Sequence, residues 1–218
     1  MALNSSSRLR ITEIFHSLQG ESNTVGVPTV FIRLTGCPLR CGYCDTSYAF
    51  KGGEWMSLQQ INTTVDGFKA RYVTVTGGEP LAQQACPELL TLLCDGGYRV
   101  SLETSGALDI SGVDSRVVRV MDIKTPASGE VEKNLYQNIE QLNPHDQVKF
   151  VICNEADYQW SRQLLRDLDL ESRCEILFSP VNGTQDPTQL AEWILRDHLN
   201  VRFQIQLHKY LWGDVGGR

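Results

Sequence analysis

Three closely spaced cysteines constrain this chain more than any other feature of its sequence. Cys37, Cys41 and Cys44 follow the pattern Cys-x3-Cys-x2-Cys within residues 36–46, a stretch that also contains two glycines and a proline. Glycine and proline favour tight turns, so the three thiols are expected on one short loop. A loop of this kind can wrap a metal centre.

The number of cysteines in the loop limits which metal centre it can hold. Structural zinc almost always has four protein ligands, and iron–sulfur clusters usually have four cysteine ligands. A fourth ligand is missing nearby, and a four-iron cluster bound by three thiolates would leave one iron open to a small molecule. The alternative is three structural cysteines with a distant fourth ligand, such as Cys86 or Cys153.

The composition is typical of one folded domain in a reducing compartment. The chain has 218 residues, and its formal net charge of -6 argues against broad binding to nucleic acids or anionic membranes. An odd count of seven cysteines, three of them clustered, suits metal binding better than disulfides. We expect a cytoplasmic protein with no membrane-spanning run, a disordered segment at residues 1–10 and a single domain at residues 11–218.

Strand and helix patterns alternate along most of the chain, although residues 107–116 show no helical period. The expected strands cover residues 11–15, 29–34, 71–76, 99–102, 117–121, 147–152, 175–178 and 201–207. The expected helices cover residues 57–69, 87–95, 134–142, 156–168 and 186–199. This alternation predicts an α/β fold, an open partial (β/α) barrel of about six or seven mostly parallel strands, with ligands at the carboxyl ends of the strands.

Two of the expected strand ends carry residues that suit ligand binding. Arg33 lies in an otherwise apolar strand directly before the cysteine loop, and a buried arginine needs an anionic partner. From the residues alone, a structural carboxylate and a bound ligand are equally suitable partners. Gly77 and Gly78 follow a later strand and allow a ligand close to the backbone, where Glu79 could hold an ammonium group.

Several short motifs resemble those of a known superfamily. The cysteine pattern followed by Asp45-Thr46, together with Thr-Gly-Gly-Glu-Pro at residues 76–80, resembles the radical S-adenosylmethionine (SAM) enzymes. Leu-Gln-Gly-Glu at residues 18–21 and His-Lys-Tyr-Leu-Trp at residues 208–212 resemble the 7-carboxy-7-deazaguanine synthase family within it. The resemblance covers nearly the whole chain and implies the same partial barrel.

The resemblance implies a lyase that converts 6-carboxy-5,6,7,8-tetrahydropterin to 7-carboxy-7-deazaguanine with loss of ammonia, on the route to queuosine and other 7-deazapurines. It implies a 4Fe-4S cluster whose open iron binds SAM, a Mg²⁺ ion, and an electron donor such as flavodoxin or ferredoxin. An electron from the cluster would cleave SAM to a 5′-deoxyadenosyl radical, without an acid–base pair. The implied partners are a small pterin and a second copy of the chain, with no nucleic acid and no membrane.

The resemblance also implies roles for individual residues. Cys37, Cys41 and Cys44 resemble the cluster ligands, and Thr46 resembles the magnesium ligand. The implied substrate-binding residues are Leu18, Gln19, Gly20, Arg33 and Thr76. The implied SAM-binding residues are Tyr43, Cys44, Asp45, Gly78, Glu79, Asp122, Ile123, Lys124, Phe178, Ser179, Pro180 and Val181.

The chain departs from the family pattern at two places. Ser22 stands where the family often has a second glycine after Gly20-Glu21, which puts the turn geometry in question. The segment at residues 122–124, Asp-Ile-Lys, replaces a Ser-Pro-Lys type segment, which puts the side-chain contacts near Lys124 in question.

Two other functions are compatible with parts of the sequence. An activase of a glycyl-radical enzyme would share the cysteine loop and the Gly-Gly-Glu-Pro turn, but it would not need residues 18–21 or Arg33 to clamp a small molecule. A non-catalytic module could hold zinc with the three cysteines and one remote ligand.

Overall fold

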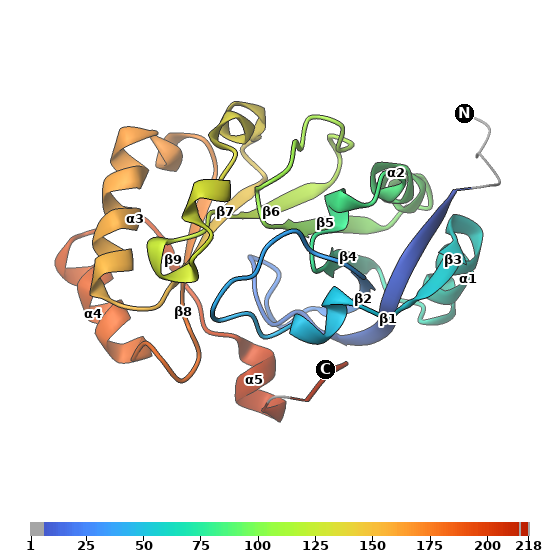
Figure 1. The fold of residues 1–218 in the computed structure, drawn as a ribbon, viewed down its shortest axis with the longest axis horizontal. Helices are drawn as coiled ribbons and strands as arrows, with labels where there is room; N and C mark the ends of the chain where they lie inside the picture. Colours follow the sequence, from blue (N-terminus) through green and yellow to red (C-terminus); the bar gives the residue numbers. More distant parts are fainter. Residues whose placement is uncertain (1–6, 214, 218) are drawn as a thin grey trace.

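The computed structural model describes residues 7–213 and 215–217, which form one open sheet flanked by helices (Figure 1). The strand order is β3-β1-β2-β4-β5-β6-β7-β8-β9. The strands are β1 (Arg8–Leu18), β2 (Pro28–Leu34), β3 (Glu54–Ser57), β4 (Tyr72–Gly77), β5 (Arg99–Thr104), β6 (Val118–Asp122), β7 (Gln147–Ile152), β8 (Glu175–Pro180) and β9 (Arg202–Phe203). Neighbours from β2 to β9 are parallel, so the predicted open, mostly parallel α/β sheet is confirmed.

An antiparallel edge extends the sheet beyond the predicted parallel strands. β1 pairs antiparallel with both β2 and β3, and β3 was not predicted from the sequence. Arg8, Leu9 and Arg10 pair with β3, and the Leu9 side chain is fully buried. The prediction of disorder is therefore wrong for these three residues, because β3 satisfies their backbone hydrogen bonds. Residues 1–6 lie outside the described residues.

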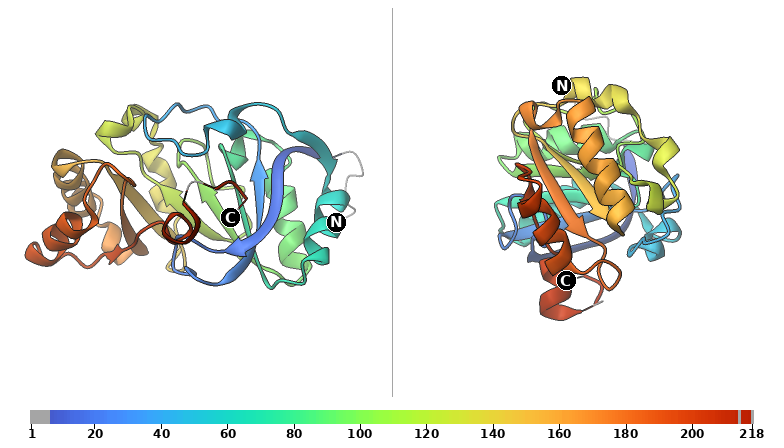
Figure 2. Two further views of the ribbon diagram at one scale, coloured as in Figure 1. Left: turned by 90° about the horizontal axis from the view of Figure 1, so that it is seen from below. Right: turned by 90° about the vertical axis from the view of Figure 1, so that its left-hand side faces the viewer.

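Four helices pack against the sheet and bury the main core. They are α1 (Leu58–Gly67), α2 (Cys86–Asp95), α3 (Glu155–Asp167) and α4 (Pro187–Arg196). Figure 2 shows α3 and α4 together at the end of the molecule that contains β7 and β8. Ser57 caps α1 in a capping box with Gln60, and Asp186 caps α4 by accepting a hydrogen bond from the Thr188 backbone N–H. The core joins helix residues such as Leu89 to strand residues such as Phe150.

Two predicted elements take another form. The expected helix at residues 134–142 is a 3-10 helix, Tyr136–Gln141, in which the buried Asn138 side chain bonds the backbone of Gly106, Leu108 and Ile110. Asn138 thereby supports the helix-free crossover at residues 107–116. The expected last strand is only two residues long. The chain then leaves β8 and forms α5 (Leu207–Trp212).

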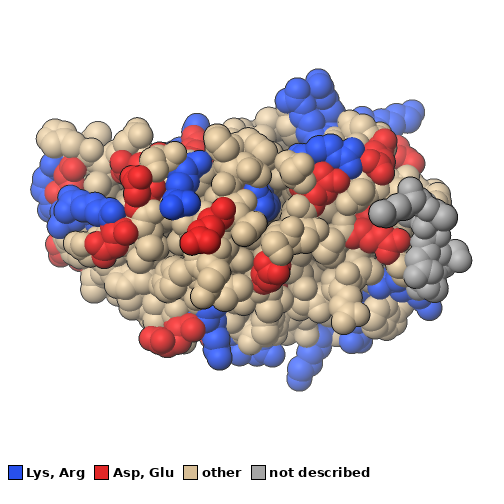
Figure 3. Space-filling model, turned by 90° about the horizontal axis from the view of Figure 1, so that it is seen from above, with Lys and Arg blue, Asp and Glu red and all other residues tan. Residues whose placement is uncertain are grey.

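Short 3-10 turns connect several strands, and the surface carries charges of both signs. The remaining turns are Ser47–Phe50, Pro80–Ala82, Pro126–Ser128, Val131–Lys133 and Leu170–Ser172. On the face shown in Figure 3, Lys and Arg side chains lie among Asp and Glu side chains. Within the described part of the chain, no helix has the length and apolar character needed to cross a membrane.

Candidate active site

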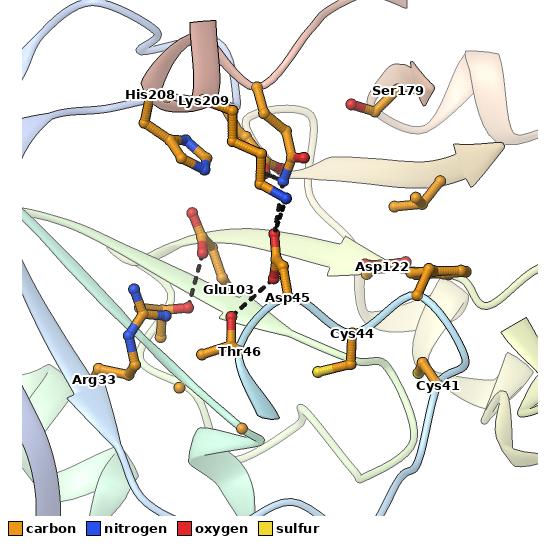
Figure 4. Close-up of a pocket in the computed structure, with 18 of the residues that line it drawn as sticks. Arg33, Cys41, Cys44, Asp45, Thr46, Glu103, Asp122, Ser179, His208 and Lys209 are labelled. Carbon is orange, nitrogen blue, oxygen red and sulfur yellow. Dashed lines mark hydrogen bonds and ion pairs between the residues drawn. The ribbon is translucent and has the colours of Figure 1, made fainter. Parts of the chain in front are cut away.

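A cavity of about 530 Å³ lies at the carboxyl ends of the parallel strands (Figure 4). Its walls come from β1, β2, β4, β5, β6, β7 and β8, from the cysteine loop and from α5. Parallel strands with helical crossovers direct their carboxyl ends to the same edge of the sheet. For that reason the polar motifs that follow successive strands meet in one place.

All three cysteines of the loop line this cavity. Cys37, Cys41 and Cys44 are each partly buried, and none forms a disulfide. Burial raises the pKa of the Cys37 and Cys41 thiols. The loop is held by backbone hydrogen bonds, including one from the Gly42 N–H to the Ser128 carbonyl oxygen at 3.0 Å. The thiols are therefore presented to the cavity by a supported backbone.

Gly78 packs directly against the cysteine loop. A Cβ atom at this position would lie 2.2 Å from the Gly36 carbonyl oxygen and 2.7 Å from Cys37 Cβ. The Glu79 N–H also donates to the Gly36 carbonyl oxygen at 2.8 Å. Only glycine permits so close an approach, so the turn after β4 and the cysteine loop form a single cradle.

The donor set of the cradle fits a multi-iron cluster. In the described residues, no three or more His, Cys, Asp and Glu side chains are grouped so that they could hold a metal ion. Cys86 and Cys153, considered above as remote fourth ligands, do not line the cavity. A four-iron cluster places its cysteine ligands on separate iron atoms, so it does not require thiols that converge on one point.

Arg33 lies in the cavity wall between two aromatic rings. Its Nε donates to Glu13 Oε1 at 2.7 Å, and its guanidinium carbon lies 5.8 Å from the ring centres of both Phe15 and Tyr48. Glu13 is therefore a structural carboxylate partner of Arg33, one of the two kinds of partner that the sequence allowed. Because one guanidinium edge faces the cavity residues, Arg33 can also pair with an anionic ligand.

Glu103 is a cavity residue that the sequence reasoning missed. The Thr76 hydroxyl donates to its Oε2 at 2.8 Å, and Gln19 Nε2 donates to its Oε1 at 3.4 Å. Burial, and the nearby Glu21 carboxylate, raise the pKa of Glu103. Glu103 directly follows the expected strand at residues 99–102, so a carboxyl group at the carboxyl end of that strand was the available signal.

A network of charged residues crosses the far wall of the cavity. Lys149 Nζ lies 2.7 Å from Glu21 Oε2 and 3.7 Å from Asp122 Oδ2, and Lys124 Nζ lies 2.9 Å from the same Asp122 oxygen. Burial disfavours the charged forms of Glu21, Lys124 and Lys149, yet Lys149 lowers the pKa of Glu21, and Asp122 raises the pKa of Lys124. Asp122 Oδ1 is buried and has no hydrogen-bond partner in the described structure, so it can accept one from a ligand.

Thr46 and Asp45 follow the last cysteine and face the same cavity. The Thr46 hydroxyl donates to Asp45 Oδ1 at 2.9 Å, which leaves the oxygen lone pairs of Thr46 to coordinate a cation. Hard cations such as Mg²⁺ prefer oxygen ligands. The residues present therefore fit a magnesium ion that is completed by substrate and water.

Three of the residues assigned to SAM binding have other surroundings. Glu79, Ile123 and Phe178 are buried and do not line the cavity. The Glu79 carboxylate accepts hydrogen bonds from the Thr104 hydroxyl, from the Ser105 N–H and hydroxyl, and from the Leu81 N–H. It therefore joins the ends of β4 and β5 instead of facing a ligand.

The other assigned residues do line the cavity. They are Leu18, Gln19, Gly20, Arg33, Cys37, Cys41, Tyr43, Cys44, Asp45, Thr46, Thr76, Gly78, Asp122, Lys124, Ser179, Pro180 and Val181. The sequence reasoning gave no site role to Glu103 or Lys149, and it included Glu21 only as part of the motif at residues 18–21. Ser22, where the family often has glycine, has a φ of 67°, so the turn keeps the backbone conformation that favours glycine.

Comparison with known proteins gives the same family from sequence and from structure. Residues 31–123 match the radical SAM superfamily. The chain is 45% identical to 7-carboxy-7-deazaguanine synthase from Chlorobaculum tepidum, over 96% of this chain and 97% of that protein. It is 42% identical to the protein of the same name from Koribacter versatilis, over 94% and 97% of the two chains.

The solved structure of QueE from Escherichia coli superposes with a TM-score of 0.78 at 26% identity, covering 92% of this chain and 95% of that one. These relatives support a radical SAM lyase over the activase of a glycyl-radical enzyme and over a zinc module. From its fold, its cysteine loop and these relatives, the chain belongs to the 7-carboxy-7-deazaguanine synthase family of the radical SAM superfamily.

Proposed function

We propose that this chain converts 6-carboxy-5,6,7,8-tetrahydropterin to 7-carboxy-7-deazaguanine with loss of ammonia, using a 4Fe-4S cluster, SAM and Mg²⁺. The observation that carries the proposal is the meeting of three cysteine thiols, Arg33 and Glu103 in one cavity, on a chain of this family. The cavity thus has ligands for a cluster, and beside them a cation and a carboxyl group that suit a small substrate with a carboxylate at one end and N–H donors at the other.

Cys37, Cys41 and Cys44 would hold the cluster, which together with SAM supplies one-electron chemistry when bound. The chain itself holds the cofactor in place. Gly78 would line the cofactor site where it packs against the cysteine loop, and the unpartnered Asp122 Oδ1 would accept a hydrogen bond from a hydroxyl group. The other proposed SAM contacts are Tyr43, Asp45, Lys124, Ser179, Pro180 and Val181.

The substrate would lie between β1, β2 and β5. Arg33 would pair with the substrate carboxylate, which the Mg²⁺ ion at Thr46 would also contact. The Glu103 carboxyl group would accept hydrogen bonds from the amino-pyrimidine edge of the pterin, because that edge carries adjacent N–H groups. Thr76 and Gln19 hold Glu103 in place for this contact.

The partners and location belong to the same proposal. A flavodoxin or ferredoxin would supply the electron, and the protein would act in the cytoplasm on a small molecule, with no nucleic acid and no membrane partner. The chain would form a homodimer, because β3 leaves one edge of the sheet unpaired in the described residues and Trp55 on it is 56% exposed.

A binding comparison tests the substrate. We expect SAM-loaded, cluster-reconstituted protein to bind 6-carboxytetrahydropterin at least about tenfold more tightly than tetrahydropterin lacking the carboxylate, because one charge-assisted pair at Arg33 is lost. Calorimetry in the presence of magnesium measures both affinities. Equal affinities would exclude the proposed grip on the carboxylate.

A further inference from the structure

The short helix α5 lies across the open side of the barrel (Figures 1 and 2). The Leu207 N–H, at the first residue of α5, donates to the Gly20 carbonyl oxygen at 3.0 Å. A Cβ atom on Gly20 would lie 2.1 Å from His208 Nδ1. The motif after β1 and the start of α5 are therefore fitted to each other, although 187 residues separate Gly20 from Leu207 in sequence.

The side chains of Gln206, the residue directly before α5, and of Lys209 on α5 join parts of the site that no strand pairing connects. Gln206 Nε2 donates to Glu21 Oε1 at 2.9 Å and to Asp45 Oδ2 at 3.0 Å. Lys209 Nζ lies 3.0 Å from the same Asp45 oxygen, and Figure 4 shows Lys209 pointing from the helix toward Asp45. Glu21 belongs to the motif after β1, and Asp45 follows the last cysteine of the loop.

Two lysines balance the carboxylates at this junction, and one of them, Lys209, comes from α5. Lys149 neutralises one oxygen of Glu21 and Lys209 neutralises Asp45, while the Gln206 amide is shared between the two carboxylates. The Lys209 side chain is only 15% exposed. Detaching α5 would leave Asp45 without this cation beside the cysteine loop.

We propose that α5 is a clasp that closes the open side of the barrel, and that Gln206 and Lys209 are its positioning residues. They hold the cysteine loop against the motif after β1, and they keep water out of the cavity between the two. That the closed cavity protects a radical reaction rests on the proposed function, whereas the clasp itself rests on the contacts above.

Hydrogen exchange on the metal-free full-length protein tests the clasp without activity. The reporters are the amides of Leu207, Lys209, Tyr210 and Gly213, whose N–H groups donate to Gly20, Gln206 and Lys209 carbonyl oxygens. Gln206→Glu would place a third carboxylate beside those of Glu21 and Asp45. Lys209→Glu would replace the cation beside Asp45 with a second negative charge. We expect these amides to exchange at least about tenfold faster in both variants, with α2 and α3 unchanged.

Two variants serve as controls for the exchange measurement. Lys209→Arg keeps the charge and is expected to exchange at the parental rate. Gln163→Glu makes the same change as Gln206→Glu on the exposed face of α3, beside the Asp167 carboxylate that Gln163 bonds, and should leave α5 unaffected. Parental exchange rates in Gln206→Glu and Lys209→Glu, or equal acceleration in every helix, would overturn the clasp.

A second readout separates the clasp from the proposed function. In reconstituted enzyme, Gln206→Glu and Lys209→Glu should lower the ratio of 7-carboxy-7-deazaguanine to free 5′-deoxyadenosine several-fold, and Lys209→Arg should restore it. An unchanged ratio would overturn the protective role. If the parent makes no deazaguanine while exchange still responds as expected, the proposed function fails and the clasp stands.

Discussion

At the scale of single residues, the site is built from charged groups that are at least partly buried and that have partners within the protein, either charges of opposite sign or hydrogen-bond donors. Arg33 pairs with Glu13, Lys149 with Glu21, and Glu79 with hydrogen-bond donors of its own chain. Glu103 has no cationic partner at hydrogen-bonding distance in the described residues. Its ionised form is therefore the least stabilised of these carboxylates before substrate binds.

Glu103→Gln tests this residue through the pH dependence of stability. Because the folded pKa of Glu103 is raised above 4.5, the free energy of unfolding falls as the pH rises from 4.5 to the folded value and stays low above it. Glutamine has no proton to release, so the free energy of unfolding of the variant should not show this fall. Relative to the parent, it should rise over that pH range by about 1.4 kcal/mol per unit of pKa difference. Urea unfolding at about pH 5 and about pH 8 measures the gain.

The exposed Glu192→Gln on α4 is the matched control for that measurement, and its difference from the parent should not change with pH. If the difference in free energy of unfolding between Glu103→Gln and the parent is the same at both pH values, the raised pKa is contradicted.

Glu79→Gln tests whether the carboxylate of the Gly-Gly-Glu-Pro turn is structural. Its hydrogen-bond donors come from Leu81, Thr104 and Ser105, so an amide nitrogen in place of one oxygen would face N–H and O–H groups. We expect the free energy of unfolding to fall by about 1–3 kcal/mol in the absence of SAM. The exposed Glu132→Gln is the control. Unchanged stability together with weaker SAM binding would instead make Glu79 a ligand-binding residue.

Arg33→Lys tests the proposed grip on the substrate. Lysine cannot pair with Glu13 and also present a planar fork to a second carboxylate. The Michaelis constant for the pterin should rise about tenfold, while the iron and sulfide content stays at the parental value. An unchanged Michaelis constant at full cluster content would remove Arg33 from the substrate site.

At the scale of elements, helix ends and strand polarity were predictable, but pairings between distant segments were not. The capping box at Ser57 and the N-cap at Asp186 are local patterns, and the helices that they begin were expected at residues 57–69 and 186–199. β3 forms only because residues 8–11 lie beside it, and the short β9 reflects the departure of the chain toward Gly20. Neither the pairing of β3 nor the short length of β9 can be deduced from the residues near it in sequence. The Asn138 side chain likewise supports the helix-free crossover at residues 107–116 through hydrogen bonds to backbone about 30 positions away in sequence.

The end of α4 offers a test at this scale. The N–H of His198 donates to the Leu195 carbonyl oxygen, and that of Leu199 donates to the Ile194 carbonyl oxygen, which is a Schellman motif with His198 at φ 51°. His198 is exposed, so His198→Gly should raise the free energy of unfolding by about 1 kcal/mol by removing left-handed strain. Urea unfolding measures it. His198→Ala is the control, and an equal gain in both would contradict the account.

At the scale of the whole molecule, the open sheet explains both the site and the limits of the sequence reasoning. The order of strands and polar motifs was enough to place the cysteine loop, Arg33 and Thr76 at one edge. It could not show that the Glu79 carboxylate bonds Thr104 and Ser105, because a residue that follows a glycine turn can face either side. Nor could it show that Lys149 reaches Glu21, since that contact depends on how far the sheet curves.

The central claim is the reaction, and one anaerobic measurement tests it most directly. The cluster is reconstituted, and dithionite, SAM, magnesium and 6-carboxytetrahydropterin are added while products are followed by mass spectrometry. The account predicts 7-carboxy-7-deazaguanine with many turnovers per SAM. Release of 5′-deoxyadenosine without the deazaguanine would contradict it, and it would return the activase of a glycyl-radical enzyme to consideration.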